Sequence, residues 1–172
     1  MAISEASSGD ITELMNIDRQ SFKDSWGSGS WNLIIASDTY TVLVAARKYR
    51  GERSGPVEGY IVYGNGVYGE GGLVVSSGTG EATACVLSVA VLMDSRGQGI
   101  GSRLLQSIPV LGHEDVHAMV VADANKAIGL FRSCGFTCQE CSINEEDTVV
   151  HMISKKLIPT GREQYDGSQE ES

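Results

Sequence analysis

The feature that most constrains the fold is a glycine-rich segment, residues 96–102, which reads Arg-Gly-Gln-Gly-Ile-Gly-Ser. An apolar run over residues 85–91 precedes it and predicts a buried strand, and residues 100–108 predict a helix. The glycines therefore form a turn that leads from a strand into a helix N-terminus. Unpaired N–H groups and the positive end of the helix dipole favour an anion there, such as a phosphate.

The glycine spacing excludes two common phosphate loops. A Walker loop needs Gly-x-x-x-x-Gly-Lys-Ser/Thr, and no lysine follows these glycines. A dinucleotide fingerprint needs Gly-x-Gly-x-x-Gly after a first strand, whereas Gly97, Gly99 and Gly101 are spaced two by two and lie far into the chain. The order Arg-x-x-Gly-x-Gly after a strand resembles the pyrophosphate loop of the GNAT N-acetyltransferase superfamily.

A second segment, residues 125–136, strengthens this resemblance. It reads Asn-Lys-Ala-Ile-Gly-Leu-Phe-Arg-Ser-Cys-Gly-Phe and predicts a short helix, with Asp123 as its N-cap and Gly135 after its end. It is similar to a segment of the histone-type lysine acetyltransferases in that superfamily. Residues 11–26 resemble instead the first helix and following loop of ribosomal-protein N-acetyltransferases.

The resemblance covers roughly residues 3–157 and implies an α/β (α+β) GNAT fold. That fold has a mixed, mostly antiparallel central sheet, which splays open at a coenzyme A cleft and is flanked by about four helices. We expect strands at 39–48, 57–64, 117–122, 137–143 and 148–157, a short helix at 31–36 and a polar turn at 49–56. The glycine-rich stretch 65–81 predicts short strands at 67–68 and 73–75, within either a surface loop or a substrate-side lid.

The resemblance also implies acetyl-CoA as cosubstrate and assigns its binding residues. The backbone of the strand end is expected to bond the pantetheine arm, and the N–H groups of the glycine loop the pyrophosphate. Asn125 either contacts the pantetheine region or caps its helix, and Phe131 packs near the thioester. The full set is Val89, Ala90, Val91, Arg96, Gly97, Gln98, Gly99, Ile100, Gly101, Ser102, Asn125 and Phe131.

No familiar catalytic base stands where the resemblance would place one. The two branches of the superfamily carry a glutamate at positions held here by Cys85 and Val120. The candidates that remain are Glu81, Ser88, Tyr60, Tyr63 and His117. The chain is thus either an enzyme that acetylates a primary amine (a protein N-terminus, a lysine or a small amine) or an acetyl-CoA-binding module without efficient turnover.

Composition limits the partners. The 172 residues carry a formal net charge of −9, which disfavours nucleic acid and suits a cationic amine. We expect one domain over residues 1–158, an acidic disordered tail over 159–172, and a monomer or homodimer. No apolar run is long enough to span a membrane and no secretion signal begins the chain, so we expect a cytoplasmic protein, the nucleus not being excluded. The cysteines are expected to be free thiols, with no metal site.

Overall fold

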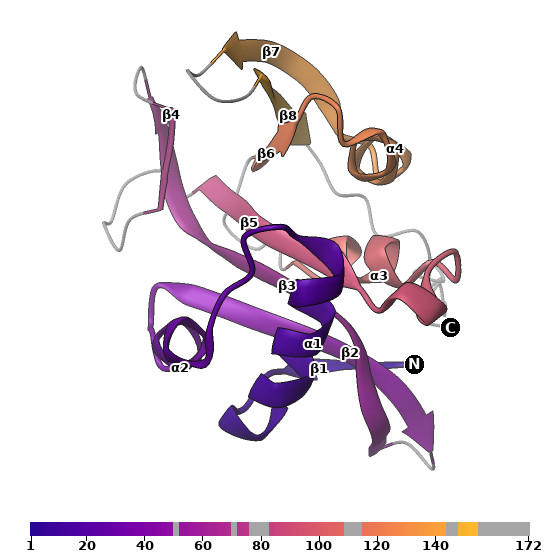
Figure 1. Cartoon of the computed structure of the whole chain (residues 1–172). Coiled ribbons are helices and arrows are strands. Elements are labelled where there is room, and N and C mark those ends of the chain that lie inside the picture. The colour runs from indigo at the N-terminus through magenta and orange to yellow at the C-terminus, as the bar shows by residue number, and fades with distance from the viewer. Residues whose placement is uncertain (50–51, 70–71, 76–82, 109–114, 144–147, 155–172) are drawn as a thin grey trace, which may run out of the picture.

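The computed structural model describes residues 1–49, 52–69, 72–75, 83–108, 115–143 and 148–154. Four α-helices and eight strands occur within these residues (Figure 1). The helices are α1 Ile11–Ser21, α2 Ser28–Ile35, α3 Ile100–Gln106 and α4 Asn125–Ser133, with single 3-10 turns at Ser8–Asp10 and Met93–Ser95. The strands are β1 Ala2–Glu5, β2 Tyr40–Tyr49, β3 Glu52–Gly69, β4 Gly72–Val75, β5 Thr83–Val91, β6 Val116–Val121, β7 Thr137–Ile143 and β8 Thr148–Ser154.

The strands form one sheet in the order β1-β2-β3-β5-β6-β8-β7, with β4 paired to β3 beyond this path. Every strand pair is antiparallel except β5 with β6, which run parallel. A parallel pair needs a long crossover, and here the segment containing α3 supplies it. The expectation of a mixed, mostly antiparallel sheet with about four helices is confirmed.

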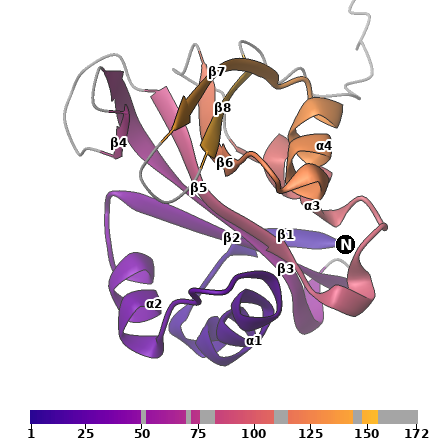
Figure 2. The ribbon, with the colours of Figure 1, turned by 45° about the horizontal axis from the view of Figure 1, so that its top comes forward.

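The helices cover opposite faces of the sheet: α1 and α2 lie on one, and α3 and α4 on the other (Figure 2). Side chains alternate along each strand, so neighbouring residues of β3 belong to different cores. Tyr60 and Val62 pack with Leu14 and Trp31 on the α1–α2 face. Ile61 packs with the α3–α4 face.

The polar turn predicted at 49–56 is wrong. β2 continues to Tyr49 and β3 already begins at Glu52. The register of the two strands shifts between Ala46 and Lys48, and on the facing strand Gly55 has a φ of 90°. A β-bulge can absorb a glycine and a proline in this way, so the Gly55-Pro56 pair interrupts the ladder without ending the strand.

The glycine-rich stretch after residue 64 is partly strand. β3 runs on to Gly69, and its last residues pair with β4 in a second hairpin. The predicted short strands at 67–68 and 73–75 are therefore confirmed. Residues 76–82 lie outside the described residues, so a lid at this position stays a prediction.

Gly59 fixes how closely α3 approaches the sheet. A Cβ at Gly59 would lie 3.0 Å from the Ala90 carbonyl oxygen, 3.1 Å from Ile100 and 3.3 Å from Leu104. We expect Gly59→Ala to lower the free energy of unfolding by about 1–3 kcal/mol, because the strand and helix must move apart. Urea denaturation measures this.

The matched control is Gly129→Ala on α4, where a Cβ meets no atom within 4 Å. It should raise the free energy of unfolding by up to about 1 kcal/mol, since alanine favours helix. Equal effects of the two variants would contradict the predicted close approach at Gly59.

Candidate functional site

The sheet opens between its two parallel strands. β5 and β6 pair only at their beginnings, where Ala84, Cys85 and Val86 face residues 116–118. Past Val86, β5 pairs with β3 alone within the described part of the sheet. One edge of the second half of β5 is thus left without a neighbouring strand. The splay predicted at this place is present.

The hydrogen-bond pattern shows which backbone groups line this open edge. The N–H of Leu92 donates to the carbonyl of Glu58 on β3, at 2.8 Å. Antiparallel strands alternate, so Ala90 and Ser88 also turn their backbone groups toward β3, where they face Tyr60 and Val62. Val89 and Val91 therefore turn theirs toward the open edge, where an extended ligand can add as a strand.

The glycine loop follows β5 and leads into α3 (Figure 2). Gly97 and Gly99 have φ angles of 77° and 76°, a region that favours glycine. Gly99 is the N-cap of α3, and its carbonyl accepts the N–H of Arg103 at 3.1 Å. The N–H groups of Gln98, Gly99, Gly101 and Ser102 have no backbone acceptor among the described residues. Unpaired N–H groups at the start of a helix favour an anion.

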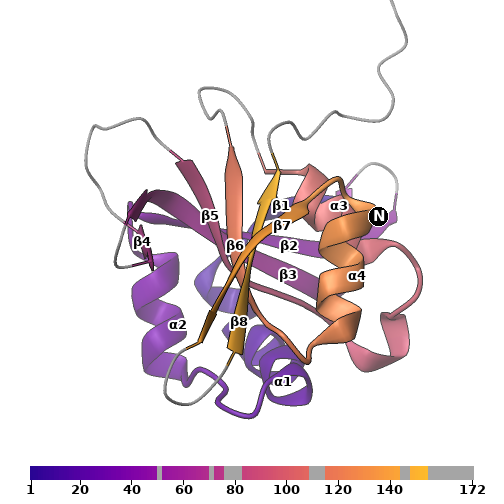
Figure 3. The same ribbon diagram turned by 90° about the horizontal axis from the view of Figure 1, so that it is seen from above.

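The third glycine of the motif has a different role. A Cβ at Gly101 would lie 3.0 Å from a methyl carbon of Leu130, so Gly101 lets α3 pack closely against α4. Figure 3 shows the two helices side by side. Ile100 is buried in the same core. Of the three glycines, only Gly97 and Gly99 leave open space above the loop.

Arg96 links the loop to the end of β5 and to α1. Its Nε donates to the Val91 carbonyl at 2.9 Å, and a terminal nitrogen donates to Ser21 Oγ on α1 at 3.1 Å. The Val91 carbonyl is therefore already paired, and only the N–H of Val91 stays available at the open edge. The guanidinium ties the end of β5, the loop and α1 together.

Asn125 and Phe131 lie on α4. Asn125 is at the start of the helix, and Phe131 is on its buried face. The prediction that Asp123 caps this helix is wrong, because Ala124 occupies the N-cap position and makes no side-chain cap. Asn125 is the first helical residue, is exposed, and has no side-chain hydrogen bond within the described ranges. Its amide can reach a ligand. Phe131 is buried, edge-on to Phe136 with ring centroids 5.0 Å apart.

Two of the catalytic candidates, Tyr60 and Ser88, are hydrogen-bonded to each other. Their oxygens lie 3.1 Å apart, and the Tyr60 hydroxyl also donates to the carboxylate of Asp18. Asp18 accepts a second bond from the backbone N–H of Trp26. Burial, followed by the bond to Asp18, raises the pKa of the Tyr60 phenol, so this hydroxyl stays protonated and is no general base at neutral pH.

Asp18 is the residue that sequence reasoning missed. It is only 2% exposed, although it carries a carboxylate. A signal was present: Leu14, Ile17 and Asp18 follow the i, i+3, i+4 spacing of one helix face, and all three are buried. A charged residue in an apolar stripe needs a buried partner, and Tyr60 is that partner.

The remaining candidates lie away from this chain of hydroxyls. Burial raises the pKa of Tyr63 and lowers the pKa of His117, while the charge of Asp115 acts on His117 in the opposite direction. His117 faces Cys85 where β5 and β6 still pair, before the sheet opens. Glu81 lies outside the described residues.

The positions where a glutamate was expected are apolar. Cys85 is fully buried, and burial raises the pKa of its thiol to about 11, so it is a core thiol and no nucleophile at neutral pH. Val120 is buried in the core under α3 and α4. Neither position supplies a base.

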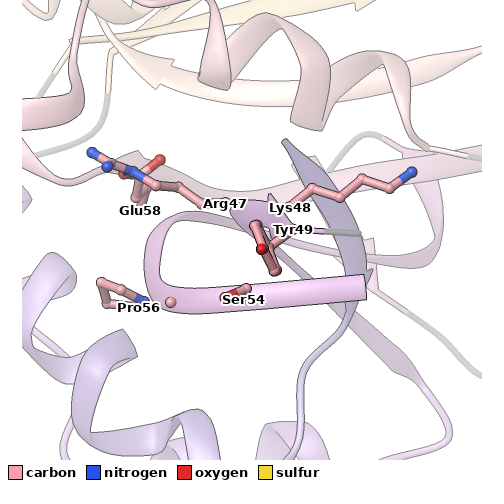
Figure 4. A pocket seen from close by; sticks show the side chains of 7 residues that line it. Arg47, Lys48, Tyr49, Ser54, Pro56 and Glu58 are labelled. Carbon is pink, nitrogen blue, oxygen red and sulfur yellow. The ribbon is translucent and has the colours of Figure 1, made fainter. Parts of the chain in front are cut away.

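A separate hollow of about 570 Å³ lies at the β2–β3 hairpin (Figure 4). Arg47 and Glu58 point toward one another there and form an ion pair with a 3.0 Å separation. The lining residues are Arg47, Lys48, Tyr49, Ser54, Gly55, Pro56 and Glu58. None of them belongs to the predicted coenzyme set.

The described residues show neither a metal-binding cluster nor a membrane-spanning helix. Among them, no group of three or more His, Cys, Asp or Glu side chains is placed to hold a metal ion. No helix in this part of the chain is long and apolar enough to cross a membrane.

Comparison with known proteins decides the family. Residues 38–138 match the family model described as an acetyltransferase (GNAT) domain. The chain belongs to the GNAT acetyltransferase family. The matched residues include β5, the glycine loop and α4, which are the parts of this GNAT domain that surround the open edge. No curated protein matches the sequence.

Solved structures share the fold at low sequence identity. Arabidopsis thaliana NAA60 in complex with acetyl-CoA aligns with a TM-score of 0.73 and 16% identity, over 90% of this chain and 99% of that one. The Escherichia coli ribosomal-protein-S18-alanine N-acetyltransferase aligns with 0.68 and 17%, over 95% and 98%. A variant of the Vibrio cholerae spermidine N-acetyltransferase SpeG aligns with 0.66 and 14%, over 90% and 95%. These likenesses show the GNAT fold.

Proposed function

We propose that this GNAT chain transfers the acetyl group of acetyl-CoA to a primary amine. The observation that carries the proposal is the open edge of β5 that ends in the glycine loop. An extended pantetheine arm would pair with the backbone of Val89 and the N–H of Val91. The pyrophosphate would accept the N–H groups of Gln98, Gly99, Gly101 and Ser102.

The other predicted coenzyme residues support this placement in different ways. Gly97 and Ile100 shape the turn and anchor it, Ala90 holds β5 against β3, and Arg96 keeps the loop in position. The Asn125 amide would contact the pantetheine, and Phe131 would pack near the thioester. The Arg96 guanidinium already has two partners, Val91 and Ser21. We therefore assign Arg96 to holding the loop, and the pyrophosphate would be bound by backbone N–H groups.

The chemistry needs an amine nitrogen held in line with the thioester carbon. Holding the two reactants in this geometry supplies much of the rate enhancement. As the nitrogen–carbon bond forms, the thioester oxygen gains negative charge, which a backbone N–H at the open edge would stabilise. The carbon–sulfur bond then breaks, and coenzyme A leaves as its thiolate.

The acceptor is a protein N-terminus or a lysine side chain in preference to a small amine. The relatives whose names state an acceptor act on ribosomal-protein alanine or on spermidine. Each of these acceptors presents a primary amine. The net charge of −9 on this chain favours the approach of such amines, which are cationic when protonated. The alternative is an acetyl-CoA-binding module without efficient turnover, which the apolar residues Cys85 and Val120 favour.

A thiol-release assay separates the two functions. The protein is mixed with acetyl-CoA and, in turn, peptides with free N-termini, a lysine-containing peptide with a blocked N-terminus, and spermidine. We expect thiol release that depends on one of the peptides. Binding of acetyl-CoA with no acceptor-dependent release would favour the binding module.

Phe131 provides a smaller test of the same placement. We expect Phe131→Tyr to keep or modestly raise kcat/KM, because the new hydroxyl would point toward the departing thiolate. Steady-state kinetics on the folded variant measures this. Phe136→Tyr is the control, since Phe136 belongs to the same core but to no predicted contact with the coenzyme. A Phe131→Tyr variant that folds and loses activity would contradict the proposed orientation of α4.

A further inference from the structure

A chain of hydrogen bonds leads from a buried carboxylate to the open half of β5. Asp18 on α1 is joined to the Tyr60 hydroxyl on β3, and Tyr60 is joined to Ser88 on β5. Asp18 is 2% exposed and Tyr60 is fully buried, whereas Ser88 is half-buried. Only Ser88, the last member of these hydrogen bonds, is partly exposed, and it lies on the half of β5 that does not pair with β6.

The donors and acceptors in this chain of hydrogen bonds follow one direction. The Tyr60 hydroxyl donates to the Asp18 carboxylate, so the hydroxyl proton points to Asp18. The Tyr60 oxygen must then accept the proton of Ser88. The Ser88 oxygen keeps its lone pairs, and within the described ranges nothing else pairs with it. A hydroxyl that usually rotates freely is therefore held as an acceptor.

Strand geometry places this acceptor at the opening. β5 pairs with β3 at Tyr63↔Val86 and then at Val62↔Ser88, so Leu87 is an extra, bulged residue. Bulges bend a strand and redirect the side chains next to them. Ser88 is the first residue after the bulge and lies beyond Val86, the last residue of β5 that pairs with β6.

We propose that Ser88 Oγ accepts a hydrogen bond from the N–H of the attacking amine. Tyr60 and Asp18 would hold the lone pairs of Ser88 Oγ toward that amine. This inference rests on the proposed function. Ser88 is the residue that contacts the substrate, while Tyr60 and Asp18 are positioning residues. A primary amine suits the site because one N–H can donate to Ser88 while the nitrogen lone pair faces the thioester carbon.

The contact strengthens as the reaction proceeds. The nitrogen becomes positively charged when its bond to the acetyl carbon forms, so its N–H becomes a better donor to Ser88. The carbon–sulfur bond breaks, the thiolate leaves with its electron pair, and the extra proton on nitrogen passes to water.

The test compares Ser88→Ala with Ser88→Thr. Ser88→Ala should lower kcat/KM for the amine by about tenfold to a hundredfold, the range for a hydrogen bond to a charged group. Ser88→Thr keeps the hydroxyl on a residue that favours strands and should restore most of the rate. Calorimetry should show unchanged affinity for acetyl-CoA in both. Ser107→Ala is the control, because that hydroxyl bonds to the Arg103 carbonyl at the end of α3.

The positioning residues are tested by a double-mutant cycle. Asp18→Asn and Tyr60→Phe should each lower kcat/KM in the wild-type background and have little further effect beside Ser88→Ala. Circular dichroism and acetyl-CoA affinity check that each variant folds. Additive losses would contradict the proposal that Asp18, Tyr60 and Ser88 act together. An unchanged kcat/KM for folded Ser88→Ala would contradict the contact between Ser88 and the amine. If the wild-type protein acetylates no amine, the proposed function itself fails.

Discussion

A Gly99→Glu variant is expected to lose at least about a hundredfold in affinity for acetyl-CoA. Gly99 is exposed at the start of α3, and a Cβ there meets no atom within 4 Å. The new carboxylate would enter the space proposed for the pyrophosphate. Two like unit charges 4 Å apart repel by about 4 kcal/mol at an effective dielectric constant of 20, which accounts for a loss of this size.

The control for this variant is Gly99→Asn. The φ of 76° at Gly99 strains any side chain, but asparagine tolerates this conformation better than most residues and carries no charge. We expect the asparagine variant to keep most of its affinity in the same calorimetric titration. Unchanged affinity in a folded Gly99→Glu protein would remove the pyrophosphate from this loop.

The second large effect is the pH dependence of turnover. With neither Cys85 nor Val120 able to act as a base, the reaction should depend on ionisation of the amine itself. A lysine-type amine has a pKa near 10.4. The value of kcat/KM should therefore rise about tenfold for each pH unit from pH 7 toward about pH 10, without a plateau near neutrality.

The same profile reports the acceptor class. A peptide α-amine has a pKa near 8, so its rise should level off about two units earlier. Glu81→Gln should change either curve little. A plateau between about pH 6 and 7.5 with a high-pKa amine, abolished by Glu81→Gln, would name Glu81 as the general base instead.

Local sequence patterns predicted the parts of the site that lie next to each other along the chain. The strand, glycine turn and helix around Gly99 are contiguous, so periodicity and residue type determine them. The sequence also placed the opening of the sheet between the two parallel strands, through the family resemblance. Coenzyme contacts made by these residues remain predictions.

Contacts between distant segments could not be predicted in the same way. Asp18 and Tyr60 are 42 residues apart, and Tyr60 and Ser88 are 28 apart, so their bonds depend on how α1 packs on the sheet. The bulge at Leu87 also depends on pairing with β3 and leaves no local signal. At Gly55-Pro56, residue types typical of a turn were accommodated inside a longer hairpin by a register shift.

We propose that this chain transfers an acetyl group from acetyl-CoA onto an amine. The most direct measurement uses acetyl-CoA with an isotope-labelled acetyl group and mass spectrometry of the acceptor peptide. We expect the label on a primary amine of the peptide, in proportion to the coenzyme A thiol released, and its loss in Gly99→Glu. Released thiol with labelled acetate and an unlabelled peptide would contradict acetyl transfer.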